Sequence, residues 1–414
     1  MRKTGRSSME NGLRMPYPLA LSMTAEQTAQ GVRVMRPVDK SAICLLGMTV
    51  AGFATGPVSA QGFGGGPAAE PSAIRSVPAE TTAAAVTDRN WKAPRTSWDH
   101  PSFEGVWSTD DMRSVGTNRP EQFGTREALT AEEFRQRASR DEGGKDLAAN
   151  RETFLRNEWG IRTFGYSSLV IDPPNGRVPE MTPAGKARAA ARDRGTFGPG
   201  PFDDFEDFTL YDRCITRGVL GSTLPVIYGN GIRIVQNPAS VAISYEMIHD
   251  TRIIALDGRP PISDDIRQYM GNARGHWEGD TLVVETTRFT DKTSIGGNGN
   301  GTRHSEDLKL TERFTRVDPD MIQYIATVED PITYTAPFTF RLMITTQPNY
   351  ETYEYSCHEG NGAVGHSLSG ERAYERQVAE AVAQGLPVPP RATGMSIYGA
   401  PREGADVFDI NAGE

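Results

Sequence analysis

The chain lacks the features that mark several large classes of protein. It has only 3 Cys in 414 residues, too few for a disulfide-dense scaffold. No apolar run reaches the length of about 18 residues that a membrane helix needs, which argues against a polytopic membrane protein. Basic residues are not in excess, because 44 Lys and Arg stand against 53 Asp and Glu, and nucleic-acid binders need a basic face. We therefore expect a large globular protein that does not bind nucleic acid.

Recognisable metal and phosphate motifs are also lacking. The chain has 6 His, and none forms H-x-H or H-E-x-x-H. Glu246 and His249 have an E-x-x-H spacing, but the local pattern is strand and then turn, so their side chains should not share a face. The glycine-rich stretch 296–301 does not open a helix, so we interpret it as a flexible connection. We expect no cofactor and no metal, with a zinc site assembled from distant strands left open.

The segment 35–60 has the layout of a secretory signal. Arg36 and Lys40 give a short positive start, residues 41–55 form a short apolar stretch, and residues 58–60 are the small residues that signal peptidase accepts. The alternative is a single membrane anchor, for which this stretch is short and weakly hydrophobic. We expect cleavage after residue 60, a periplasmic or secreted protein, and no membrane span in the mature chain.

The cysteines agree with export. Cys44 is removed with the signal, so the mature chain keeps Cys214 and Cys357. In an oxidising compartment two cysteines most simply form one disulfide. A catalytic thiol is the alternative, which a lone cysteine would support better than this pair. We predict the Cys214–Cys357 disulfide.

The second half of the chain is rich in strand signals. Segments with β-branched or aromatic residues and partial alternation recur at short intervals; they are 226–236, 241–247, 251–257, 273–277, 281–289, 308–316, 322–329, 338–347 and 352–357. An earlier strand is predicted at 103–107, which makes about ten. Short turns between strands favour an antiparallel meander, and closure removes its exposed edges. We predict a mainly β protein, an antiparallel meander closing into a lipocalin-like barrel with a few peripheral helices.

Helix signals lie outside this strand-rich region. Thr130 and Glu133 match a capping box, which predicts a short helix ending near Ser139. Thr182 precedes a proline at the first position of a second helix. Residues 371–384 are rich in Ala, Glu and Arg and predict a third.

These signals divide the chain into five parts. Residues 1–34 suggest that the start codon has been assigned too early, with translation beginning at Met35, and residues 35–60 are the predicted signal peptide. Residues 61–97 are poor in large apolar side chains and predict a flexible leader. Residues 98–385 should form a single β-barrel domain with helical N-terminal insertions and a C-terminal helix. Residues 386–414 predict an irregular tail.

Several long phrases resemble a family of exported bacterial proteins whose activity is uncharacterised. They are EMIHDTRIIALDGRP at 246–260, GHWEGDTLVVET at 275–286, ERFTRVD at 312–318 and YEYSCHEGN at 353–361. The resemblance covers most of residues 160–370 and implies an exported protein, but it brings no reaction with it. The WEGDTLVV and ERFTR phrases are also similar to lipocalin-like meander barrels, an analogy that concerns the fold alone.

Two glutamates are candidates for acid–base chemistry. Leu308, Leu310, Glu312 and Phe314 alternate along one strand, so the Glu312 carboxylate should share a face with three apolar residues, where desolvation raises a carboxyl pKa. The same alternation places Glu285 among apolar neighbours. The alternative for both is a buried ion pair with an arginine such as Arg313, Arg252 or Arg288.

His249 is the predicted catalytic base. It occupies a turn between two strongly apolar strands, at the rim of the expected barrel, where a base reaches ligand and water together. Asp250 beside it would set its tautomer. The alternative is a turn histidine that bonds the local backbone.

Charged residues near this hairpin and near the second cysteine are binding candidates. Arg252 would clamp a substrate anion, and Asp257 would contribute to binding; the alternative is that both latch a loop to the barrel. His358 follows Cys357 directly, so a disulfide would hold it rigidly, and the alternative is a solvated loop residue.

Strand aromatics complete the predicted site. Tyr245 and Tyr324 would line a cavity for a small hydrophobic or aromatic ligand; alternatively such side chains fill the barrel. Two functions follow. The first is an exported, cofactor-free enzyme, an isomerase, lyase or hydrolase, with His249 as base, Glu312 or Glu285 as partner acid and Arg252 as anion anchor. The second is a periplasmic binding protein that leaves its ligand unchanged.

Overall fold

The computed structural model describes residues 75–76, 91–150, 160–190, 201–226, 228–297, 301–347 and 350–391. The predicted early start and signal peptide lie outside these residues, as do most of the leader and of the tail. The described helices and strands are β1 (Arg75–Ser76), β2 (Gly105–Ser108), α1 (Ala131–Asn150), β3 (Arg162–Thr163), β4 (Val170–Asp172), α2 (Pro183–Ala190), α3 (Val219–Thr223), β5 (Gly231–Asn237), β6 (Ser240–Tyr245), β7 (Thr251–Ala255), β8 (Asn272–Glu278), β9 (Thr281–Thr287), β10 (Ser294–Ile295), β11 (Thr302–Arg303), β12 (Lys309–Asp318), β13 (Met321–Glu329), β14 (Phe338–Thr345) and α4 (Ala363–Ala383).

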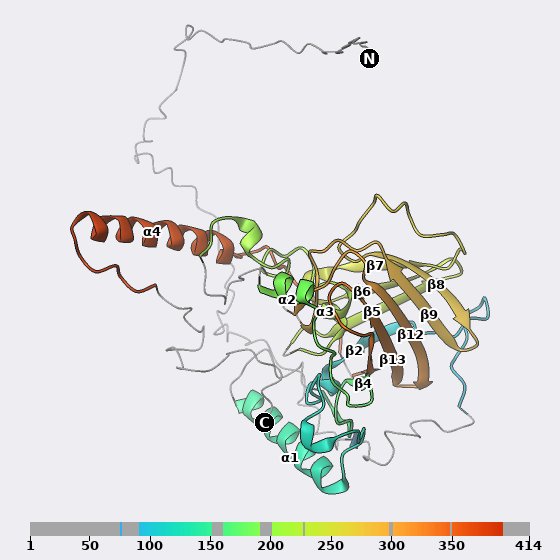
Figure 1. Cartoon of the computed structure of the whole chain (residues 1–414). Helices are drawn as coiled ribbons and strands as arrows, with labels where there is room; N and C mark the ends of the chain where they lie inside the picture. Colours follow the sequence, from blue (N-terminus) through green and yellow to red (C-terminus); the bar gives the residue numbers. More distant parts are fainter. Residues whose placement is uncertain are drawn as a thin grey trace, which may run out of the picture. The chain divides into compact units, whose positions relative to one another are not determined.

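A closed β-barrel is the centre of the fold (Figure 1). Its strands follow one another in the order β2-β5-β6-β7-β8-β9-β12-β13-β14, and β14 closes the ring by pairing with both β13 and β2. This confirms the predicted mainly β barrel, with nine strands in the ring within the described residues, while β4 pairs with β14 outside it. Closure leaves few strand edges exposed, which the meander pattern predicted.

One junction of the ring differs from an antiparallel meander. β7 and β8 run parallel and pair only at Ala255 and Arg274, whereas the other neighbours in the ring are antiparallel. Parallel neighbours cannot be joined by a tight hairpin and need a crossover. The long link between β7 and β8 is that crossover. This part of the wall, like the β14–β2 junction with its single pair, is held by less backbone pairing than the other junctions of the ring.

The strand predictions are confirmed for most of the ring. The predicted segments at 281–289, 308–316 and 322–329 correspond to β9, β12 and β13 with shifts of a few residues at their ends. The predicted strand at 352–357 is wrong, because that segment carries no strand. Its backbone groups bond individual residues instead of a neighbouring strand: the N–H of Tyr353 donates to the Glu246 carboxylate at 3.2 Å, and the N–H of Cys357 donates to the carbonyl of Tyr355 at 2.9 Å.

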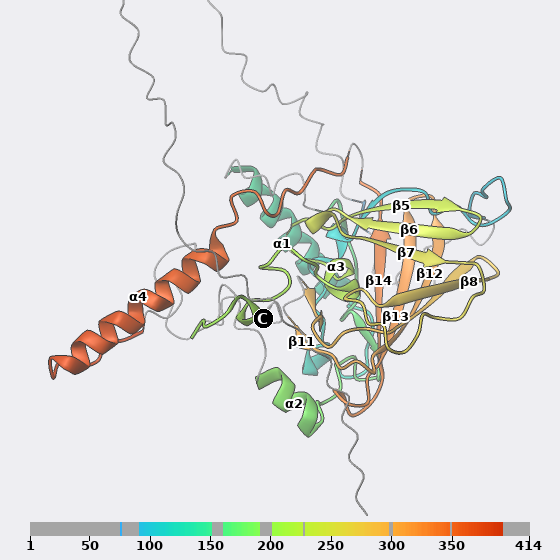
Figure 2. The same ribbon diagram turned by 90° about the horizontal axis from the view of Figure 1, so that it is seen from above.

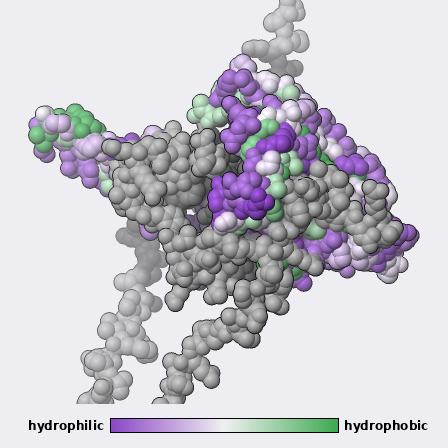
Figure 3. Space-filling model, turned by 90° about the horizontal axis from the view of Figure 1, so that it is seen from below, coloured by the Kyte–Doolittle hydropathy of each residue, from purple (hydrophilic) through white to green (hydrophobic). Residues whose placement is uncertain are grey.

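The barrel interior is packed with side chains from alternate strand positions. On β12 the buried residues are Leu310, Glu312 and Phe314, as their alternation predicted, while the intervening residues are half-exposed. Large aromatic side chains, including those of Tyr245, Tyr324, Phe338 and Phe340, belong to the same buried core. The burial of each such side chain contributes about 1.5–3 kcal/mol to stability. Figure 3 shows a largely hydrophilic described surface on one face of the molecule, as expected when apolar side chains are turned inward.

Two of the three predicted helices begin where their caps predict, whereas α4 begins at Ala363, before the predicted start at 371. The Thr130 backbone N–H donates to the Glu133 carboxylate at 2.7 Å, and the Glu133 N–H donates back to the Thr130 hydroxyl at 3.3 Å, which confirms the capping box at the start of α1. This helix runs to Asn150, well beyond the predicted end near Ser139. α2 begins at Pro183 after the Thr182 cap, whose hydroxyl accepts from the Gly185 N–H at 3.0 Å. None of the described helices combines the length and apolarity that crossing a membrane requires.

Part of the predicted leader is attached to the domain. β1 pairs in parallel with β3 through Arg75 and Arg162. Further along, the Arg95 guanidinium bonds the Asp280 carboxylate at 2.5 Å. The ordered domain therefore includes contacts from residues before the predicted boundary at 98.

Candidate functional site

A cleft opens in the barrel wall where β7 and β8 separate. It has a volume of about 470 Å³ and is lined by β7, the start of β8, the link between them and residues 215–216. Figure 2 shows β5, β6 and β7 side by side, the regular part of the wall next to the opening. Since β7 and β8 share a single register pair, the cleft occupies the place where further strand pairing would otherwise be.

The β7 backbone presents hydrogen-bonding groups to this cleft. The Tyr245 N–H donates to the Asp250 carbonyl and the Leu256 N–H donates to the Ala239 carbonyl. In an antiparallel pair the backbone groups of successive residues point to alternate sides. Asp250, Arg252 and Ile254 thus bond β6, which leaves the N–H and C=O groups of Thr251 and Ile253 directed toward the cleft.

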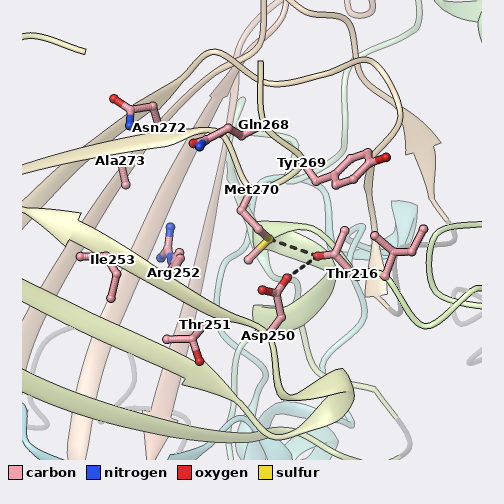
Figure 4. Close-up of a pocket in the computed structure, with 12 residues that line it drawn as sticks. Thr216, Asp250, Thr251, Arg252, Ile253, Gln268, Tyr269, Met270, Asn272 and Ala273 are labelled. Atoms are coloured by element: carbon pink, nitrogen blue, oxygen red, sulfur yellow. Dashed lines mark hydrogen bonds between the residues drawn. The ribbon is translucent and has the colours of Figure 1, made fainter. Parts of the chain in front are cut away.

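The side chains around the cleft combine apolar and polar groups, six of which are Ile215, Ile253, Met270, Thr216, Asp250 and Gln268. The Thr216 hydroxyl donates to the Asp250 carboxylate at 2.6 Å and lies 3.3 Å from the Met270 sulfur, as Figure 4 shows. Asp250 was expected to orient His249. Its carboxylate is bonded instead to Thr216 on the cleft.

Arg252 links the cleft to the barrel interior. Its side chain lines the cleft and its Nη1 and Nη2 donate to the two oxygens of Glu312 at 2.6 and 2.7 Å. The Tyr324 hydroxyl donates to Oε1 of the same carboxylate at 2.8 Å. The two charged side chains are 3% and 0% exposed. The buried ion pair, which was one of the alternatives for Glu312, is therefore what the structure contains.

The charges of this pair stabilise each other. Burial by itself lowers the pKa of Arg252, but the charge and hydrogen bonds of Glu312 outweigh it and raise that pKa. Burial, followed by the Glu312 charge, raises the pKa of Tyr324 well above its ordinary value. Both Glu312 oxygens are engaged inside the barrel by two guanidinium nitrogens and a phenol, and Glu312 is not among the residues that line the cleft.

Tyr245 lies beside this pair. It is 2% exposed, its hydroxyl is 3.1 Å from the Thr223 hydroxyl, and its pKa is raised by burial. The predicted set is thus partly assembled: Arg252, Glu312, Tyr324 and Tyr245 share the core, where the aromatic rings pack rather than line an open cavity.

The position of His249 does not support its predicted role as catalytic base with Glu312 as the partner acid. The side chain is exposed, and its Nδ1–H donates to the Tyr355 carbonyl at 3.1 Å. Ile248 and His249 have φ of 66° and 49°, the left-handed region that forms a tight turn. The ring is bound to the backbone of the 350–361 segment. The alternative, a turn histidine that bonds the local backbone, is therefore right about the turn and about a backbone partner, but that partner is distant in the chain.

The interior placement of Glu285 is wrong. Its side chain is exposed and forms an ion pair with Lys309 at 3.0 Å. Residues 282–284 are all apolar, so the sequence is compatible with either strand phase. The register sets Val284 opposite Glu312, which turns Val284 inward and Glu285 outward.

The two remaining binding candidates lie on the surface. The Asp257 carboxylate bonds the guanidinium groups of Arg259 and Arg274, so it latches the start of the link to β8, as its alternative proposed. His358 is exposed. The Cys214–Cys357 disulfide is confirmed. Among the described residues, no group of three or more His, Cys, Asp and Glu side chains is arranged to hold a metal ion.

Sequence reasoning missed the crossover residues Gln268 and Met270 and the buried histidine His304. The stretch between the strands predicted at 251–257 and 273–277 is too long for a hairpin, and this was the available signal for a crossover. His304 is 2% exposed; its Nδ1–H donates to the Ser305 carbonyl at 2.9 Å and its Nε2 accepts from the Thr293 hydroxyl at 2.5 Å. No local pattern distinguishes it from a loop histidine.

Comparison with known proteins gives no relative from which a function could be carried over: the chain matches no protein-family model, no curated protein and no solved structure.

Proposed function

We propose that this is an exported protein that binds a small, largely apolar or aromatic molecule in the β7–β8 cleft and releases it unchanged. The observation that carries the proposal is the cleft itself. Its volume of about 470 Å³ is within the range of small-molecule sites, which is about 300–1,000 Å³. Export is supported by the disulfide, since disulfides persist in oxidising compartments.

Binding is favoured over the acid–base enzyme because the expected catalytic groups do not converge. An enzyme of that kind needs at least two titratable groups within reach of one point. His249 is bonded to the Tyr355 carbonyl, Glu285 faces outward, and the Glu312 carboxylate is bonded to the Arg252 guanidinium. Asp250 lines the cleft, but its carboxylate is bonded to the Thr216 hydroxyl.

The lining indicates the chemistry of the ligand. The Arg252 charge is compensated by Glu312, so Asp250 leaves the cleft with a net negative charge. Ile215, Ile253 and Met270 offer apolar contact, and the β7 backbone offers donors and acceptors. A neutral or singly cationic molecule with an aromatic or aliphatic body fits this combination.

A matched pair of substitutions tests the proposal with the neutral aromatic fluorophore N-phenyl-1-naphthylamine as probe. Val235, Ala242 and Ile253 form one row across β5, β6 and β7, and Val235 and Ile253 are 51% and 58% exposed. Ile253→Trp places an indole in the cleft, whereas Val235→Trp adds the same ring two strands away. We expect Ile253→Trp to weaken the Kd about tenfold or more, and Val235→Trp to leave it unchanged.

Equal effects of the two substitutions, or no saturable binding by the wild type, would contradict the cleft as the site. Conversion of the bound molecule into a product would instead support the enzyme.

A further inference from the structure

Arg217 is a buried cation whose binding edge is unused. Its side chain is 1% exposed, and Nη1 donates to the Gly229 carbonyl at 3.2 Å. In the part of the chain that the structure describes, Nε and Nη2 are buried without a hydrogen-bond partner. These two N–H groups lie on the same edge of the guanidinium and point in parallel, which is the arrangement that grips two oxygens of one anion.

Other deeply buried arginines have a partner for their charge or for this edge of the guanidinium. Arg252 and Arg162 are bonded to the carboxylates of Glu312 and Asp111. Arg119 donates from Nε to the Ser167 hydroxyl at 2.9 Å. Among the described arginines, Arg217 alone has both Nε and Nη2 buried without a partner. A buried charge in this state is costly, and an anionic partner removes the cost.

Four tyrosines lie near enough to this guanidinium to act on its charge. The groups that act on its charge most strongly, after burial itself, are Tyr211, Tyr228, Tyr355 and Tyr245, and burial lowers the pKa of Arg217 to about 10. The hydroxyls of Tyr211 and Tyr228 are 3.3 Å apart, and Tyr355 is hydrogen-bonded to both. Phenols donate to oxyanions and provide aromatic rings for an organic body.

The surroundings of Arg217 are fixed from several directions. The Cys214–Cys357 disulfide joins the chain just before Arg217 to the chain just after Tyr355. The His249 ring donates to the Tyr355 carbonyl. Tyr211, Tyr228 and Tyr355 are only half-buried, so part of each side chain reaches the surface. Donors held in place in this way need little rearrangement on binding.

We propose that Arg217 and these tyrosines form a binding site for the carboxylate of a small organic acid, with Nε and Nη2 donating to its two oxygens. This site is separate from the β7–β8 cleft, and its ligand has the opposite charge preference. It does not depend on the function proposed for the cleft.

The test measures binding of benzoate, acetate and inorganic phosphate at constant ionic strength, with chloride as the reference anion. Calorimetry and the shift in melting temperature give the Kd. For the wild type we expect saturable binding of benzoate. Arg217→Gln should weaken it at least tenfold, and Arg217→Lys, which keeps the charge but loses the two-donor edge, should weaken it nearly as much.

Arg119→Gln is the matched control, because Arg119 is equally buried and its Nε is already bonded; it should leave the benzoate Kd unchanged. Ile253→Trp should also leave the benzoate Kd unchanged while it weakens binding of the neutral fluorophore, so the two proposals can fail separately.

Three results would overturn the carboxylate site: no saturable benzoate binding by the wild type, equal binding by wild type and both Arg217 variants, or a response to phosphate with none to benzoate or acetate.

Discussion

Single residues in this protein take their properties from burial more than from their neighbours in sequence. His304 is an example: it follows Arg303 in a polar stretch, yet its ring is 2% exposed and packs edge-on against Phe289. Its Nδ1–H bonds the Ser305 carbonyl, which fixes the neutral tautomer with Nε2 as acceptor. Burial lowers the pKa of His304 below its ordinary value of 6.5.

This lowered pKa predicts acid destabilisation. In the unfolded chain the imidazole takes up a proton near pH 6.5, whereas in the folded protein it stays neutral to lower pH. Between these two values the unfolded state binds more protons, so the free energy of unfolding decreases as pH decreases, by up to about 1.4 kcal/mol per pH unit. Above pH 6.5 the contribution disappears.

Urea unfolding of the wild type and His304→Gln between pH 5 and 7 measures this effect, and the variant should have a smaller pH slope. His276→Gln is the control, because His276 is 57% exposed. Identical slopes for wild type and His304→Gln would show that His304 is not the group responsible.

Elements are joined across the barrel by the Arg252–Glu312 pair, which connects β7 to β12. Periodicity on β12 predicted that Glu312 faces inward, and the choice between free acid and ion pair was left open. β7 pairs with β8 at one position, and Arg252 of β7 lines the cleft that opens there. Its guanidinium points to the barrel core, where it bonds Glu312. A local sequence pattern contains no information on which arginine reaches across a barrel.

Breaking this pair should be strongly destabilising. Glu312→Gln keeps the shape of the side chain but leaves a buried guanidinium without its counter-charge, which costs about 3–5 kcal/mol. Glu285→Gln is a matched control on the neighbouring strand β9, because Glu285 is exposed and paired with Lys309; an exposed pair contributes about 0–1 kcal/mol.

Chemical denaturation of both variants provides the comparison. A loss of under 1 kcal/mol for Glu312→Gln would mean that the pair does not stabilise the barrel as its burial indicates.

At the scale of the whole molecule, the disulfide connects the segment just before α3 to the chain after β14, the last strand of the barrel. Cys214 and Cys357 are 143 residues apart, so their link encloses most strands of the ring. Asn361 supports the same junction by donating to the Asp212 carbonyl at 3.0 Å.

Removing the disulfide should lower the stability of the whole barrel. A link that encloses so long a loop restricts the unfolded chain, and its loss typically costs about 2–5 kcal/mol. We expect the double substitution Cys214→Ser with Cys357→Ser to reduce the free energy of unfolding by this amount. Dithiothreitol should destabilise the wild type equally and leave the double variant unaffected; a wild type insensitive to dithiothreitol would contradict the prediction.

The sequence by itself determined the features that depend on short-range pattern. Alternation and turns predicted the mainly β barrel and the inward phase of β12, capping residues predicted where α1 and α2 begin, and two remaining cysteines predicted their bond. Each of these features follows from interactions within a few residues, or, for the disulfide, from the presence of only two cysteines in the predicted mature chain.

The tertiary structure alone decided what depends on register and on partners far along the chain. The run 282–284 allowed two phases for β9, and only its register with β12 turned Glu285 outward. The crossover before β8 opened the cleft, and the fold placed Arg217 among tyrosines from four separate segments. The physical reason is that a strand pattern specifies which face is buried, whereas the identity of the groups that meet there is set by packing between distant segments.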